Sequence, residues 1–198
     1  MARDTVTPRT WVLPGEPVPI RLMNTIWADR QGIHDDLQEP ADLADWLHAI
    51  GALDHTSPIT AQEFGQGTAL RDSLRRLAAL CADDTREAAT SAIEDIAQAV
   101  AAVNQVAGGQ SSPQIELTGN ALRLSTTPTG PAATAALADV AVEAIALFTD
   151  EASKPVRACF APGCVLYFVQ DHPRREWCST ACGNRARAAR HYQRHKST

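Results

Sequence analysis

Four cysteines near the end of the chain have the residue type and the spacing of zinc ligands. Cys159 and Cys164 enclose four residues, and after thirteen further residues Cys178 and Cys182 form a second pair. Two close pairs of thiolates supply the tetrahedron of soft ligands that zinc prefers. Since cysteine fills all four positions and leaves none for water, the pattern predicts one structural Zn²⁺ rather than a catalytic ion.

Three further side chains compete for these roles. His191 and His195 lie two and three helical turns beyond Cys182, and we expect them to face solvent or phosphate rather than to replace a cysteine. Cys81 falls in an apolar helical stripe and is interpreted as a small buried hydrophobe. A set of reduced structural cysteines is the alternative to a metal site, but two close pairs among only five cysteines argue against it.

The residues around the four cysteines predict a turn, two strands and a helix. Gly163 permits a tight backbone turn just before Cys164. Residues 165–169 are β-branched and aromatic and predict a strand, to which residues 175–178 return as a second strand. Ser179 or Thr180 can cap a helix that holds Cys182 in its first turn. A knuckle, a hairpin and a helix of this kind form a treble-clef-like zinc finger.

The helix expected after Cys182 is basic along one side. Arg187, Arg190, His191 and Arg194 recur at the spacing of one helical face. Arginine forks fit phosphate oxygens and guanine edges. The alternative is a solvated terminal helix whose positive charge complements the helix dipole, but no acidic residue follows Glu176 to pair with it. The candidate nucleic-acid-binding residues are Arg185, Arg187, Arg190, Arg194 and Lys196.

Charge is distributed unevenly along the chain. Residues 151–198 hold nine Lys or Arg and three Asp or Glu, a net charge of +6. Residues 1–150 hold nine basic and twenty acidic residues, a net charge of −11. An acidic body joined to a basic end indicates that the end contacts a polyanion while the body has another role.

The body of the chain has the periodicity of a helical domain with one short hairpin. Apolar residues at helical spacing, with caps and stops, predict helices over 20–27, from Pro40 to Gly51, from Thr60 to about 82, over 85–106 and from Pro131 to about 150. Alternation around a Thr-Gly-Asn turn predicts a β-hairpin over 114–126. We expect residues 1–150 to fold on their own core, with a hinge near 149–155.

Four polar residues of the body lie beside apolar helices: Asn24, Arg30, Arg71 and Arg75. They could meet in a pocket for a small-molecule effector. The alternative is that they are exposed helix charges or make structural hydrogen bonds. The sequence has no run of 18 apolar residues and no apolar N-terminal segment, so we expect a cytoplasmic protein that does not cross a membrane.

The end of the chain resembles the CGNR zinc-finger family of bacterial proteins. The similarity rests on Cys182-Gly183-Asn184-Arg185 together with residues 168–171, 174–178 and 185–192. The body resembles the ABATE domain at residues 22–25, 42–47 and 69–71. The resemblance implies a stress-induced transcription regulator. His172-Pro173 replaces the small hydroxyl residues usual in that family and should change only the hairpin turn.

We therefore expect a DNA-binding transcription regulator in which the body senses an effector or forms a homodimer. A single finger offers few base contacts, so useful specificity would require a dimer. An RNA-binding module or a protein-interaction adaptor, whose basic helix contacts an acidic partner, is the alternative. The sequence contains no nucleophile–base motif, phosphate-binding glycine loop or open metal site, so no enzyme activity is expected.

Overall fold

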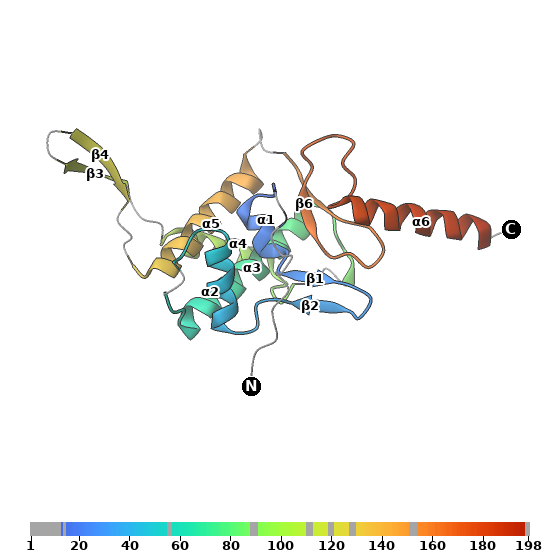
Figure 1. Cartoon of the computed structure of the whole chain (residues 1–198), viewed down its shortest axis with the longest axis horizontal. Helices are drawn as coiled ribbons and strands as arrows, with labels where there is room; N and C mark the ends of the chain where they lie inside the picture. Colours follow the sequence, from blue (N-terminus) through green and yellow to red (C-terminus); the bar gives the residue numbers. More distant parts are fainter. Residues whose placement is uncertain are drawn as a thin grey trace.

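The structure, a computed structural model, describes residues 13, 15–54, 57–87, 91–109, 113–118, 121–126, 130–150 and 154–196. The helices are α1 Val18–Met23, α2 Pro40–Ala49, α3 Ala61–Cys81, α4 Ile96–Ala107, α5 Ala132–Thr149 and α6 Thr180–Lys196 (Figure 1). Three antiparallel strand pairs accompany them: β1 Ile26–Ala28 with β2 Ile33–Asp35, β3 Pro113–Thr118 with β4 Ala121–Thr126, and β5 Val156–Ala158 with β6 Tyr167–Val169. The expected class, mainly helical with a small β-hairpin and a C-terminal zinc finger, is confirmed.

Local sequence explains where α3 begins and where α2 ends. At the start of α3 the Thr60 hydroxyl accepts a hydrogen bond from the Glu63 amide, and the Glu63 carboxylate accepts one from the Thr60 amide. This capping box satisfies two amides that the first helical turn would leave unpaired. Gly51 follows α2 with a φ of +76°, a left-handed conformation that glycine adopts without strain.

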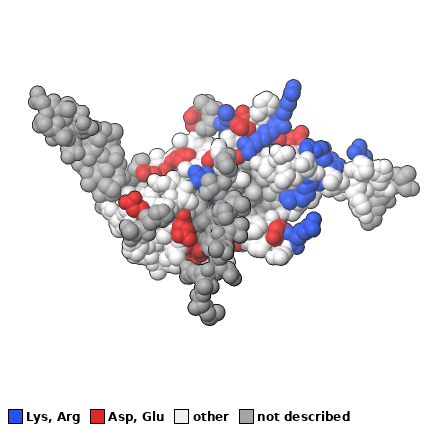
Figure 2. Space-filling view, in the orientation of Figure 1, with Lys and Arg blue, Asp and Glu red and all other residues white. Residues whose placement is uncertain are grey.

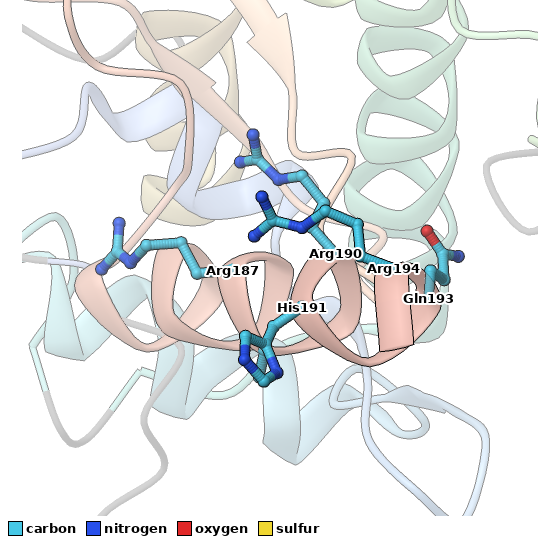
Figure 3. A pocket seen from close by; sticks show the side chains of 6 residues that line it. Arg187, Arg190, His191, Gln193 and Arg194 are labelled. Atoms are coloured by element: carbon cyan, nitrogen blue, oxygen red, sulfur yellow. The ribbon is translucent and has the colours of Figure 1, made fainter. Parts of the chain in front are cut away.

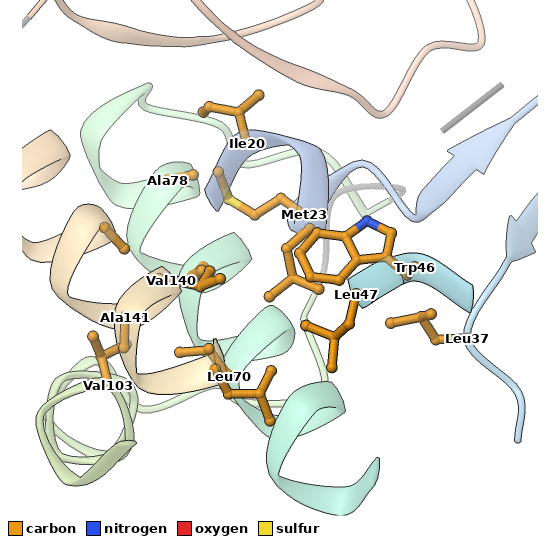
Figure 4. Close-up of a cluster of buried hydrophobic side chains, with 14 of the residues drawn as sticks. Ile20, Met23, Leu37, Trp46, Leu47, Leu70, Ala78, Val103, Val140 and Ala141 are labelled. Carbon is orange, nitrogen blue, oxygen red and sulfur yellow. The ribbon is translucent and has the colours of Figure 1, made fainter. Parts of the chain in front are cut away.

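Helices α3, α4 and α5 pack side by side and enclose the core of the body together with α1 and α2 (Figure 4). Close helix packing depends on small residues: a Cβ atom added at Gly67 would lie 2.8 Å from the side chain of Leu43. Helix α5 is long and apolar enough to cross a membrane, but its central residues are buried in this core. A core helix of a globular domain has the same composition and accounts for these contacts.

The core of the body continues into the strands that follow α5. Val156 and Ala158 of β5 and Tyr167 and Val169 of β6 are buried in the same cluster as residues of α1, α3 and α5. Strand β6 packs against α1 and β5 against α3. The division of the chain at residue 150 stays a prediction, and the shared core means that residues 1–150 alone would lack these four buried side chains.

Two helices are shorter than expected. Helix α1 ends at Met23, because Thr25 turns the chain through hydrogen bonds to the carbonyl of Leu22, and Trp27 lies in β1 instead. The helix expected over 85–106 begins only at Ile96, where the Asp95 carboxylate caps the amides of residues 97 and 98. The described residues between Asp84 and Asp95 are not α-helical, and two of them make long-range contacts instead: Arg86 donates to the carbonyl of Cys159 and Ser91 to that of Asp72.

The strand that pairs with β6 is also different from the one expected. Residues 175–178 do not form the returning strand; β5 pairs with β6 in its place. The opposite edge of β6 is satisfied by side chains. Asn24 bonds both the amide and the carbonyl of Tyr167, and Glu16 accepts from the amide of Val169. A second strand would have no free backbone groups to pair with on that edge.

Candidate zinc centre and basic helix

The four predicted ligands converge in one buried cluster. The Sγ atoms of Cys159, Cys164, Cys178 and Cys182 all lie within 4.8 Å of one another, and all four residues are buried. Two of the separations are 3.9 Å, between Cys164 and Cys178, and 3.4 Å, between Cys178 and Cys182. A zinc ion bound at about 2.3 Å from each sulfur holds its ligand atoms about 3.8 Å apart. The cluster therefore has the size of a tetrahedral zinc–thiolate site.

Local structure explains how the sequence brings the four sulfurs together. Gly163 has a φ of +70° and closes the turn in which the Cys164 amide donates to the carbonyl of Ala161, as the sequence predicted. The Ser179 hydroxyl accepts from the amide of Cys182 and so caps the start of α6. Cys182 consequently lies in the first turn of α6, facing the knuckle formed by the first pair.

The electrostatics of the cluster fit a divalent cation. Hydrogen bonds from the thiols of Cys164 and Cys178 lower the pKa of Cys159. Hydrogen bonding with Cys159 raises the pKa of Cys164, and the same interaction raises that of Cys178. A second thiolate beside the first is costly unless a cation compensates the charge. The donor set thus fits Zn²⁺, which would act here by holding the finger's fold rather than by activating water.

Arg86 links the body to the first cysteine pair, a role that sequence reasoning missed. Its guanidinium donates to the carbonyls of Cys159 and Cys164, at 3.1 and 2.8 Å, and forms an ion pair with Asp84 at 2.7 Å. Burial opposes ionisation of Asp84, but the hydrogen bonds and the charge of Arg86 outweigh it and lower the pKa of this carboxyl. Arg86 therefore ties the loop after α3 to the zinc-binding knuckle.

Helix α6 carries the candidate nucleic-acid-binding residues away from the body. Beyond Ala186, which is buried against the cysteine cluster, every residue to His195 is exposed except the half-buried Ala189. Lys and Arg side chains gather at this end of the molecule, whereas Asp and Glu lie mostly over the helical body (Figure 2). The helix thus presents positive charge to solvent on its outer turns.

The arginines of α6 differ in what they contact. Arg187, Arg190 and Arg194 line one surface hollow together with His191, and the three arginines project on the same side of the helix (Figure 3). The Arg187 guanidinium donates to Asn184 at 2.6 Å, and Arg190 lies over the ring of Trp177. Arg185 donates to the sulfur of Cys182 at 3.2 Å, so it also supports the metal centre. The side chain of Lys196 is outside the described residues.

Two family models divide the chain between them. A model of the CGNR zinc finger matches residues 156–195, and a model of the ABATE family, described as "Putative stress-induced transcription regulator", matches residues 16–151. The chain belongs to the ABATE family. Neither description names a reaction. No curated protein matched the chain.

Within the ABATE body, the four residues expected to form an effector pocket have different surroundings. Asn24 bonds the backbone of Tyr167, and the Arg75 guanidinium donates to the carbonyls of Met23 and Val165. Arg71 is buried and pairs with Asp35 and Asp72, while Arg30 is exposed between β1 and β2. These contacts favour the structural interpretation for Asn24, Arg71 and Arg75, which hold the CGNR finger and the β1–β2 hairpin against the body.

Cys81 is exposed at the last residue of α3, and the expectation of a buried side chain was wrong. The last fully buried residue of α3 is Ala78, about one turn earlier. Cys81→Ala should therefore retain the full complement of zinc and change the free energy of unfolding by about 0.5 kcal/mol or less. Elemental analysis and urea denaturation check both parts. Loss of zinc from this variant would mean that the ligand set is different.

Proposed function

We propose that this ABATE-family protein is a cytoplasmic transcription regulator that binds duplex DNA through α6, with zinc holding that helix in place. The observation that carries the proposal is the exposed arginine face of α6, which begins one turn after the last zinc ligand. The family description supports a regulator, and the excess of positive charge at this end of an acidic chain supports a polyanionic partner.

The proposal assigns different tasks to the arginines of α6. Arg187 is held by Asn184, and its fork is oriented before DNA arrives, which suits either a phosphate or a guanine edge. Arg190 and Arg194 line the same hollow and would follow the phosphate backbone. Arg185 is partly engaged by the sulfur of Cys182, so its substitution would disturb the finger as well as the contact with DNA.

The acidic body has a separate role in this proposal. Its net charge of −11 repels DNA and keeps non-specific binding weak. The body would also respond to an effector or join two copies, since one helix reads few base pairs and a homodimer would double the contacts.

The test is a DNA-binding titration at two salt concentrations. The affinity of the zinc-loaded chain should fall steeply with salt because phosphate contacts release counterions. The slope of log affinity against log salt is negative, and Arg187→Ala, Arg190→Ala and Arg194→Ala should each make it shallower by about 0.9 if the side chain contacts phosphate. A residue that reads guanine should instead cost about 1–3 kcal/mol on the preferred site only. Fluorescence anisotropy measures both quantities.

Arg157→Ala is the matched control for these variants. Arg157 is an exposed arginine of the same finger, but it lies on β5 and bonds Gln170 instead of belonging to α6. The Arg157→Ala substitution removes the same charge and should leave the slope of log affinity against log salt nearly unchanged. If the variant lacking Arg187, Arg190 and Arg194 bound DNA as tightly as the unaltered chain, the basic helix would be better explained as a contact for an acidic protein or for RNA.

A further inference from the structure

Two histidines on the outer turns of α6 are not used by the zinc centre. His191 and His195 are one helical turn apart, and both are exposed. Their Nε2 atoms lie 3.2 Å from each other, with ring centroids 4.4 Å apart and the rings tilted by 50°. Figure 3 shows His191 projecting from the opposite side of the ribbon to Arg187, Arg190 and Arg194. The imidazole of His191 therefore points away from the three arginines, although His191 lines the same surface hollow.

The separation of the two nitrogens fits ligation of one metal ion. Zinc binds imidazole nitrogen at about 2.0–2.1 Å, so two ligands of a tetrahedral site lie about 3.3–3.4 Å apart. Histidines four residues apart on one helical face form such a pair in the His-Glu-x-x-His zinc motif. A single N–H···N hydrogen bond would give a similar distance, but between exposed side chains it contributes little to stability.

We propose that His191 and His195 form a second metal site, for a divalent transition ion of the kind that imidazole binds, such as Zn²⁺, Ni²⁺ or Cu²⁺. The site is distinct from the four-cysteine centre, whose tetrahedron is complete, and it lies more than two helical turns beyond Cys182. Two protein ligands leave the other positions of the ion open to water. The site requires neither DNA binding nor a change in the finger.

Nickel is the probe for this site, because imidazole suits Ni²⁺ whereas the cysteine centre can be loaded beforehand with zinc. The full chain, without a histidine tag and with its finger zinc-loaded, is dialysed against Ni²⁺, and both metals are then measured. We expect about one nickel per chain in addition to the zinc. His191→Ala and His195→Ala should each lose the nickel and keep the zinc. Because both residues are exposed, neither change should alter the circular dichroism spectrum.

His172→Ala is the control, since His172 is an exposed histidine of the same finger outside α6. It should bind as much nickel as the unaltered chain. Nickel held by the carboxylates of the acidic body would persist when His191 and His195 are both replaced, and equal nickel content in that double variant would overturn the proposal. A complete lack of nickel binding by the unaltered chain at millimolar Ni²⁺ would overturn it equally.

Discussion

Cys178→Ser is expected to release the zinc ion and to destabilise the chain well beyond the finger. Three thiolates and a hydroxyl bind zinc far more weakly than four thiolates, and structural zinc contributes on the order of 10 kcal/mol to the folding of isolated fingers. The consequence reaches the body because Tyr167 and Val169, which lie between the two cysteine pairs in the chain, are buried in the core shared with α1. Zinc content should fall from about one per chain to near zero.

Elemental analysis and thermal denaturation measure these two effects. Cys81→Ser is the matched control, because it makes the same chemical change at an exposed cysteine outside the cluster, and its zinc content and melting temperature should stay near those of the unaltered chain. Addition of a strong chelator to the unaltered chain should reproduce the behaviour of Cys178→Ser. Full retention of zinc by Cys178→Ser would show that the metal is held elsewhere.

The parts of the molecule that were predictable from the sequence are those with local causes. The spacing within each cysteine pair, the turn at Gly163 and the capping box at Thr60 each depend on residues only a few positions apart. The basic face of α6 follows in the same way from helical periodicity. Such features need no knowledge of the rest of the fold, since the backbone and its nearest side chains determine them.

The parts that were missed depend on partners far away in the sequence. The segment before Ile96 has helical periodicity, but Arg86 reaches the carbonyls of Cys159 and Cys164, and the Ser91 hydroxyl donates to the carbonyl of Asp72. These contacts override a modest helical propensity. Likewise, β6 could not be paired correctly without knowing that Asn24, 143 residues earlier, occupies one of its edges.

The same long-range contacts explain why the finger and body cannot be treated as independent. A hinge near residue 150 would leave few contacts between them, whereas the structure places Asn24, Arg75, Arg86 and Glu16 across the junction. The ion pair of Arg175 with Glu16 adds a further link, and the Arg175 guanidinium also donates to the carbonyls of Val169 and Cys178. A ligand that changed the position of these side chains in the body would therefore also change their contacts with the finger that holds the metal centre.

Arg75→Met is expected to be the most destabilising single change at this junction. Arg75 is only 1% exposed, and its guanidinium bonds the carbonyls of Met23 in the body and Val165 in the finger while lying over the ring of Tyr167. Methionine fills similar space but leaves both carbonyls without their donor. The loss of buried partners for polar groups should reduce the free energy of unfolding by about 3 kcal/mol.

Arg76→Met separates this effect from the loss of an arginine in general. Arg76 is the next residue of α3, but it is half-buried and its guanidinium bonds the carbonyl of Glu94, so its replacement should cost about 1 kcal/mol or less. Both variants should retain zinc, because neither touches a ligand. Hydrogen exchange should nevertheless quicken at the amide of Tyr167 in Arg75→Met, since its partner Asn24 directly follows Met23 in the chain. Equal urea midpoints for the two variants would show that the buried junction contributes little, and that the finger is held to the body mainly by its apolar contacts.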